Sequence, residues 1–430
     1  MKASRKARNI GEHIHHAQCR FCLTEGMVAV VDFGNVPLAG GFLKSSATTQ
    51  DFGNEKFYPL QICFCPTCYL LQVSDIVATE VLYKDYFYFS SAIKTLVDHF
   101  IQYAEEMKQI FPDAGKRLIV ELGCNDGVFL KPLKKHGFNV IGVDPATSVV
   151  QPLIKEGFTV VNDCFTEDVA KGVAKKHGKA DAIMTSNSFA HIDDMHDVMK
   201  GVKALLKNDG ILCIEVHYLG ILLEEVQYDM MYHDHMSYYS LASLSNFFSM
   251  YGMEIYDVKM TSIHAGSIRF YVQNKKGGKH KISKGVRDLR KKEKKMGLDK
   301  ASTYHKFFEY VKKTKKELMT LLTKLKKQGK TVVGYGASGR ATAIMSFCGI
   351  TADHLEYVID DAPAKQGAYT PGNHLKIRSS TIMHDKKKRP DYCLVFAWSF
   401  INEIKKRNPD YLANGGKFIV PLPKVKVIGK

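Results

Sequence analysis

The stretch "KRLIVELGCNDGVFLKPLKKHG" (residues 116–137) predicts the fold of the middle of the chain. It begins with an apolar run, continues into a glycine-containing turn and ends in a helical pattern, and "NVIGVDPA" (139–146) follows as a second strand. Further strand patterns occupy residues 180–192, 210–219 and, as a closing pair, 254–274, with helical spacers between the earlier ones. Alternating strands and helices are typical of a parallel sheet covered on both faces. The middle of the chain is therefore predicted to be an α/β domain.

The glycine turn within this stretch indicates a ligand. Glu121 ends the first strand, and Gly123 and Gly127 allow the backbone to come close to a bound molecule at the start of the helix. The turn lacks the dinucleotide fingerprint G-x-G-x-x-G, whereas Asp144, at the end of the next strand, can accept hydrogen bonds from both hydroxyls of a ribose. We interpret this as an adenosine site without a pyrophosphate, which is typical of S-adenosylmethionine binding. An ordinary sheet turn is the alternative.

Four more residues belong to the predicted cofactor site. Asn125 lies within the glycine turn. Asp163 and Phe165 are expected to border the adenine, and Asn187, after the fourth strand, is expected near the methionine part.

The third part of the chain contains a second glycine turn, "GYGASG" (334–339), which does match G-x-G-x-x-G and again lies between a strand and a helix. The motif is compatible with NAD, but the chain already has one adenosine site. We therefore expect Gly336, Ser338 and Arg340 to bind the diphosphate of a nucleotide sugar, through the amides at the start of the helix and the guanidinium.

Four of the ten cysteines form two pairs, Cys19-x-x-Cys22 and Cys65-x-x-Cys68. Paired thiolates at this spacing are typical of a tetrahedral Zn²⁺ site. Four thiolates close the coordination shell, so the predicted zinc is structural rather than catalytic. Cys63 is a competing ligand with poorer spacing, and buried thiols without a metal are the alternative.

Length and strand patterns predict three domains, because a single core stops growing near about 250 residues and the chain has 430. We expect a zinc-binding module in residues 1–80, an S-adenosylmethionine-dependent α/β domain in 81–275, and linker helices with a second, Rossmann-like domain in 276–430.

The net charge of +17 does not by itself indicate a nucleic-acid partner. Much of the excess lies in residues 275–300 and 312–330, where apolar residues recur at helical spacing. These segments are predicted to be helices with a solvated basic face; an anion-binding surface is the alternative. No recognisable nucleic-acid module accompanies the lysines, so no nucleic-acid partner is expected.

The sequence contains no run of about 18 apolar residues, and its first residues lack the apolar segment of a secretory signal. We therefore expect a cytoplasmic protein with no membrane partner. Separately, we expect the chain to be a monomer. The segment "HIHH" (13–16) is expected to be a flexible basic tail.

A polar cluster lies at "YHDHMSYYS" (232–240), where Tyr232, His233, Asp234 and His235 are consecutive. A metal site is one interpretation, but neighbouring residues of a strand point to opposite faces, and no convincing third ligand is nearby. An acid–base cluster is the favoured interpretation.

The chain resembles the sugar C-methyltransferases of the mycarose and tetronitrose type, which methylate nucleotide-linked ketosugars. The resemblance covers almost the whole length and rests on these motifs, in order: "CRFC", "CPTC", "YFYFSS", "VELGCNDGVFL", "FAHIDD", "YHDHMSYYS", "GYGASGRAT", "KQGAYTPG" and "GGKFIVPLP". It implies a zinc-binding N-terminal domain, a central class I methyltransferase domain that binds S-adenosylmethionine, and a C-terminal Rossmann-like domain. The sugar nucleotide would lie between the last two. The family usually has glutamate where this chain has Asp234.

Methylation of a carbon needs a carbanion, and an imidazole can remove a proton next to a ketone if the enolate is stabilised. His235 is the predicted base. The resemblance implies that Tyr232 and His191 contact the keto or enolate oxygen and its neighbouring substituent. It also implies that Asp234 orients the site or holds an amino group if the sugar has one, and that Tyr86 closes the other side. Three alternatives remain: a sugar O- or N-methyltransferase, a non-catalytic sugar-nucleotide-binding protein, and an NAD oxidoreductase.

Overall fold

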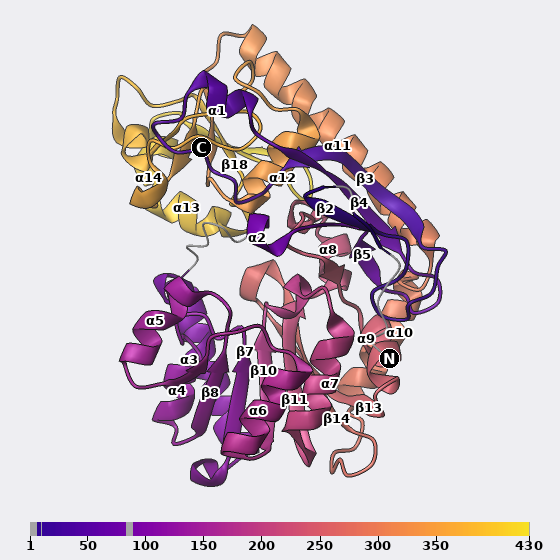
Figure 1. The fold of residues 1–430 in the computed structure, drawn as a ribbon. Coiled ribbons are helices and arrows are strands. Elements are labelled where there is room, and N and C mark those ends of the chain that lie inside the picture. The colour runs from indigo at the N-terminus through magenta and orange to yellow at the C-terminus, as the bar shows by residue number, and fades with distance from the viewer. Residues whose placement is uncertain (1–6, 10, 83–88, 430) are drawn as a thin grey trace.

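The computed structural model describes residues 7–9, 11–82 and 89–429 (Figure 1). Within these ranges the strands form a three-stranded, a four-stranded, a six-stranded and a seven-stranded sheet. None of the helices in the described part combines the length and the apolar character needed to cross a bilayer.

The seven-stranded sheet occupies the lower half of Figure 1 and has the order β13-β14-β11-β10-β7-β8-β9. Its strands β7 to β11 are parallel, while β14 is antiparallel to both of its neighbours. The strands are β7 (Leu118–Leu122), β8 (Asn139–Val143), β9 (Thr159–Val161), β10 (Ala180–Ser186), β11 (Leu206–His217), β13 (Met253–Thr261) and β14 (Ser267–Asn274). Its helices are α3 (Lys94–Ile110), α4 (Leu130–Lys135), α5 (Thr147–Lys155), α6 (Glu167–His177), α7 (Met195–Leu205) and α9 (Leu241–Ser249). The predicted α/β class is confirmed.

The N-terminal part forms two small antiparallel sheets. The three-stranded sheet consists of β1 (Ala7–Asn9), β2 (His13–His16) and β6 (Asp75–Val77). The four-stranded sheet consists of β3 (Val28–Pro37), β4 (Phe57–Phe64), β5 (Leu71–Val73) and β12 (Ser237–Tyr238), and the short helices are α1 (Thr49–Gly53) and α2 (Thr79–Leu82). The prediction of a flexible tail at 13–16 is wrong, because β2 pairs with β6 some 60 residues later. A strand from the polar cluster, β12, completes the N-terminal sheet.

The C-terminal sheet has the order β17-β16-β15-β18-β19-β20, with parallel strands except for β20 at one edge. The strands are β15 (Val332–Tyr335), β16 (Val358–Asp360), β17 (Ile377–Ser379), β18 (Tyr392–Val395), β19 (Lys417–Val420) and β20 (Lys426–Ile428). The helices are α12 (Gly339–Cys348), α13 (Ile401–Arg407) and α14 (Pro409–Ala413). This is the second parallel α/β sheet that the sequence predicted.

Three further helices connect the sheets: α8 (Leu219–Glu224), α10 (Lys284–Met296) and α11 (Ala301–Lys327). Figure 1 shows α11 running alongside β3, which it contacts. One hydrophobic core contains Ile62 and Phe64 of β4, Phe307 and Leu318 of α11, and Ile344 of α12. The first and last parts of the chain are therefore held together by the apolar face of α11, while its lysines face solvent as predicted.

Candidate active site

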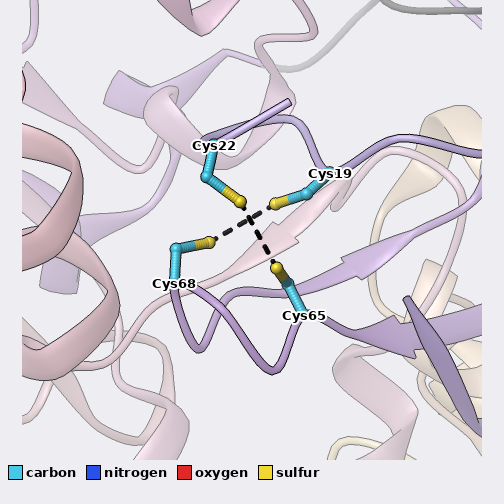
Figure 2. A group of neighbouring side chains, drawn as sticks. All are labelled: Cys19, Cys22, Cys65 and Cys68. Carbon is cyan, nitrogen blue, oxygen red and sulfur yellow. Dashed lines mark hydrogen bonds between the residues drawn. The ribbon is translucent and has the colours of Figure 1, made fainter. Parts of the chain in front are cut away.

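Four cysteine side chains meet between the N-terminal strands (Figure 2). The Sγ atoms of Cys19 and Cys68 are 3.4 Å apart, those of Cys22 and Cys65 are 3.5 Å apart, and all four lie within 4.8 Å of one another. Tetrahedral Zn²⁺ with Zn–S bonds of about 2.3 Å separates its sulfur ligands by about 3.8 Å. The arrangement therefore fits one zinc ion held by four thiolates.

Two matching turns present these thiolates, and polar groups point at the sulfur atoms. Leu23 and Tyr69, which directly follow the second cysteine of each pair, both have left-handed backbone with φ of 58° and 67°. Gln72 donates from Nε2 to Cys19 Sγ over 3.1 Å, and the Phe21 amide donates to the same sulfur over 3.4 Å. Donors directed at sulfur stabilise the thiolate form that binds a metal.

Within the described residues, three or more metal-ligating side chains come together only at the four cysteines. Cys63 is outside this group, with its Sγ atom 3.7 Å from the Gln61 side-chain oxygen. His233 also lies apart from its neighbours in the cluster, since its ring nitrogen Nε2 donates to the Pro59 carbonyl over 3.3 Å. A metal at the histidine cluster is therefore not supported.

The first glycine turn follows β7 and is closely packed. A Cβ on Gly123 would lie 2.6 Å from the Ser188 side chain, and one on Gly127 would lie 2.5 Å from Leu153, and both glycines have positive φ. Asp144, at the end of β8, accepts from the Asn125 amide over 2.9 Å through Oδ2. The turn and the two predicted acidic strand ends thus come together at one edge of the sheet.

Three carboxyl groups gather at this turn. Burial raises the pKa of Glu121 well above its ordinary value, and the nearby charges of Asp144 and Asp126 raise it further. Glu121 Oε2 is buried and has no hydrogen-bond partner within the described part of the chain. A buried acceptor in this position needs a donor, and S-adenosylmethionine brings an ammonium group and two ribose hydroxyls. The residues present therefore fit this cofactor.

The remaining predicted cofactor residues occupy different surroundings. Asp163 is exposed, and its carboxylate accepts from the Cys164 amide over 2.7 Å. Phe165 is half-buried against α7, where a Cβ on Gly201 would lie 2.9 Å from its ring. Asn187 follows β10 with φ of 58°, and its amide donates to a carbonyl of β11 over 2.8 Å. Their roles toward the cofactor stay predictions.

His235 has a defined hydrogen-bonding state. Its Nδ1 atom lies 2.8 Å from the Met230 carbonyl oxygen, which can only accept, so Nδ1 carries a proton. Its Nε2 atom lies 3.0 Å from the Tyr232 hydroxyl. In this neutral tautomer Nε2 has a lone pair and accepts the hydrogen bond from Tyr232.

His191 faces His235, with ring centroids 5.1 Å apart at an angle of 72°. Burial lowers the pKa of His191 to about 4 and holds the pKa of His235 well below its ordinary value. Burial raises the pKa of Asp234 to about 6 and that of Tyr232 well above its usual range. At neutral pH the site therefore contains two neutral imidazoles and a protonated phenol. Tyr86 lies outside the described residues.

Two further histidines, which no sequence pattern predicted, lie beside this cluster. His217 Nε2 donates to Gln227 Oε1 over 2.6 Å, and Gln227 donates in turn to the Ala265 carbonyl over 3.0 Å. His264 lies in the β13–β14 hairpin with left-handed backbone, φ 50°. Burial lowers the pKa of His217 to about 3 and that of His264 to about 4. The "HAG" turn between two predicted strands was the available signal for His264.

The second glycine turn contacts the same cluster. A Cβ on Gly339 would lie 3.9 Å from the Tyr232 ring. Ser338 caps α12 by accepting from the Ala341 amide over 3.3 Å. The amide of Gly336, which has φ of 94°, is bonded to the Ile359 carbonyl over 2.8 Å.

Arg340 is tied to a buried carboxylate. Its Nε atom donates to Asp229 Oδ2 over 2.8 Å, and Nη1 donates to Ser399 Oγ over 3.3 Å. Nη2 is buried and has no hydrogen-bond partner among the described residues. Nη2 therefore keeps hydrogen-bond donors that no described residue uses.

Three family models match consecutive parts of the chain: a zinc binding domain at residues 19–83, a methyltransferase domain at 97–258 and a C-methyltransferase C-terminal domain at 262–423. The chain is 32% identical over 411 residues to the C-methyltransferase NovU of Streptomyces niveus, covering 96% of each chain. It is 24% identical to a ubiquinone biosynthesis O-methyltransferase of Actinobacillus pleuropneumoniae, over 37% of this chain and 75% of that one.

Among solved structures, a SAM-dependent methyltransferase from Archaeoglobus fulgidus matches with a TM-score of 0.31 and 20% identity, over 37% of this chain and 71% of that one. Magnesium protoporphyrin IX methyltransferase from Synechocystis matches with a TM-score of 0.33 and 17% identity, over 45% and 90%. The family matches confirm the predicted class I methyltransferase fold with its zinc-binding N-terminal part, the enzyme class and both cofactors, S-adenosylmethionine and structural zinc.

Proposed function

Because the chain belongs to the C-methyltransferase family, we propose that it methylates a nucleotide-linked ketosugar at the carbon next to the ketone, and that His235 generates the nucleophile. The observation that carries this proposal is the neutral His235 imidazole, with Nδ1 bonded to the Met230 carbonyl and Nε2 to the Tyr232 hydroxyl. An uncharged imidazole with a defined tautomer is a suitable base for a weak carbon acid.

The proposed reaction begins with a proton transfer. S-adenosylmethionine supplies an electrophilic methyl group. His235 Nε2 takes a proton from the carbon next to the ketone, and the Tyr232 hydroxyl turns from Nε2 to the ketone oxygen, which becomes the enolate oxygen. Burial raises the pKa of the Tyr232 phenol, so it stays protonated and can donate to that oxygen. The enolate carbon then attacks the methyl group while the methyl–sulfur bond breaks, so that S-adenosylhomocysteine leaves and the ketone re-forms. His235 retains the proton until it exchanges with solvent.

His191 and Asp234 have supporting roles in this proposal. His191 is neutral at pH 7, since burial lowers its pKa to about 4, and its ring faces that of His235. Asp234 is ionised above about pH 6, where its charge favours the imidazolium that forms on His235. Aspartate has one methylene fewer than the usual glutamate, so we expect its carboxylate to act on the protein side of the site.

The nucleotide part is proposed to bind at the second glycine turn. The unpartnered Nη2 atom of Arg340 supports this placement, because a guanidinium N–H without a partner can donate to a phosphate oxygen. Gly336 and Ser338 would present the start of α12, whose positive end favours a phosphate. The contact between Gly339 and Tyr232 places this turn next to the proposed base.

The position of the new methyl group tests the proposal. The protein is incubated with methyl-labelled S-adenosylmethionine and a panel of nucleotide-linked 4-ketosugars, and products are analysed by NMR and mass spectrometry. We expect a new C–CH₃ group next to the ketone, which the product retains. A methyl group on oxygen or nitrogen, or methylation of none of the ketosugars, would contradict the proposal.

A further inference from the structure

Arg20 lies between two zinc-binding cysteines but directs its side chain toward the histidine loops. The side chain is 0% exposed. Nη1 donates to the Met236 carbonyl over 2.7 Å, and both Nε and Nη2 donate to Asp193 Oδ1 over 3.2 Å. Met236 directly follows His235, and Asp193 lies two residues after His191. One guanidinium therefore joins the two loops that carry the two facing imidazoles.

We propose that Arg20 is a positioning residue, which sets the relative placement of His191 and His235 and makes the zinc turn part of the active-site framework. The inference rests on the proposed function, in which these two imidazoles serve the reaction. Arg20 acts through the backbone of the loops and does not itself touch the reacting groups.

Backbone contacts of the same loops support this coupling. The Met236 amide donates to the Ala190 carbonyl over 2.9 Å, next to His191, and the Met236 carbonyl also accepts from the Val73 amide over 3.0 Å. Arg20 Nη1 additionally donates to Ser237 Oγ over 3.2 Å. The loop after His235 is thus held from three sides, and the Arg20 side chain reaches both histidine loops.

Gln72 connects Arg20 to the metal site. Its Oε1 atom accepts from the Arg20 amide over 2.8 Å, and its Nε2 atom donates to Cys19 Sγ over 3.1 Å. Gln72 is also paired with Ser237 in the β5–β12 ladder. Metal binding at Cys19 therefore fixes a glutamine that holds the backbone of Arg20 and the strand after His235.

The contact pattern requires arginine. A guanidinium has five N–H donors in a rigid plane and can serve a carbonyl, a hydroxyl and a carboxylate on two loops at once. A lysine ammonium presents three donors from one atom, so it cannot span the same acceptors. We expect Arg20→Lys to retain the charge and lose most of the positioning.

The test compares Arg20→Lys, Arg20→Met and the milder Asp193→Asn with wild type. The matched control is Arg117→Met, at a half-exposed arginine bonded to Asp113 and Asp181 at the start of β7. Zinc content, kcat and KM are measured, and the imidazole ¹⁵N signals of His235 and His191 are recorded by long-range ¹H–¹⁵N NMR without substrate.

We expect each Arg20 variant to keep its zinc, to lose roughly 10- to 100-fold in kcat with little change in KM, and to show shifted or doubled His235 and His191 signals. Asp193→Asn should show the same changes to a smaller degree. If the Arg20 variants do not fold, this variant tests whether the contact between Arg20 and Asp193 positions the two histidines. Unchanged imidazole signals and kcat, with zinc retained, would overturn the inference. If His235→Asn keeps full turnover while Arg20→Met still alters the His235 signals, the proposed function fails and the coupling stands.

Discussion

Replacing Asp229 with leucine is expected to weaken the contact between the histidine loop and the C-terminal sheet. The Asp229 side chain is 0% exposed, and its Oδ2 atom accepts from Arg340 Nε over 2.8 Å and from Trp398 Nε1 over 2.9 Å. Leucine removes this acceptor, so both hydrogen bonds are lost and the Arg340 cation, 16% exposed, is left without its carboxylate. The neighbouring Met230 carbonyl holds His235, so the change also lies next to the proposed base.

The magnitude follows from what each substitution leaves behind. Removing one partner of a buried ion pair costs about 3–5 kcal/mol. The cost of Asp229→Leu should lie at the lower end of this range, because Arg340 stays partly exposed to solvent and keeps its hydrogen bond to Ser399. Arg340→Met should fall at the upper end, because it leaves a carboxylate with no exposure. With roughly 2–4 °C per kcal/mol for a domain of this size, Tm should fall by about 6–12 °C and about 10–20 °C, respectively.

Differential scanning calorimetry of both single variants and the double variant measures this effect. The double variant Asp229→Leu/Arg340→Met should lose less than the sum of the single losses, because neither charge is then left unpaired. Lys94→Ala serves as the control, since it breaks an exposed pair with Asp98 and should shift Tm by less than about 2 °C. If each single variant lowers Tm no more than the control does, or if the two decreases in Tm add strictly in the double variant, Asp229 and Arg340 do not form a stabilising buried pair.

Three further predictions concern the cofactors and the pH dependence. Cys68→Ser should abolish zinc binding and lower Tm, because three thiolates no longer close the tetrahedral shell. Cys63→Ser should keep its metal. Equal zinc content in the two variants, measured by atomic emission, would contradict the assignment of the ligands. Asp144→Ala should weaken S-adenosylmethionine binding roughly 10- to 100-fold in calorimetry, since a hydrogen bond to a charged acceptor contributes about 1.5–3 kcal/mol. The control Asp209→Ala, at an exposed aspartate, should leave the affinity unchanged. Equal affinities in the two variants would count against a cofactor site at Asp144. Burial raises the pKa of Asp234 to about 6, so kcat/KM should fall as pH drops through 6 and the carboxylate becomes protonated. Asp234→Asn should remove this acidic limb of the pH profile. If the limb persists in the variant, another group causes it.

Local patterns in the sequence predicted the parts of the site that lie close together in the chain. The strand, glycine turn and helix around Gly123, and the acid Asp144 after the next strand, could be recognised because the contacts between consecutive parallel strands follow from their order. The paired cysteines could be recognised because metal geometry requires their spacing.

The sequence did not predict the contacts that cross between distant segments. The strand β12 has two residues and no alternation of its own, yet it joins the N-terminal sheet through Gln72 and Ser237. No role was predicted for Arg20 between two zinc ligands, because its acceptors lie more than 170 positions away in the chain. The left-handed backbone of His264 depends on its hairpin, so periodicity could not place it beside the cluster. The predicted domain boundaries and the oligomeric state stay predictions.

Solvent exchange at the substrate carbon shows whether His235 is the base. A nucleotide-linked 4-ketosugar is incubated in D₂O with the protein and S-adenosylhomocysteine in place of the methyl donor, and deuterium at the carbon next to the ketone is followed by NMR. We expect the wild type to exchange that proton and His235→Asn to lose both exchange and methyl transfer. Full exchange and turnover in His235→Asn would show that His235 is not the base.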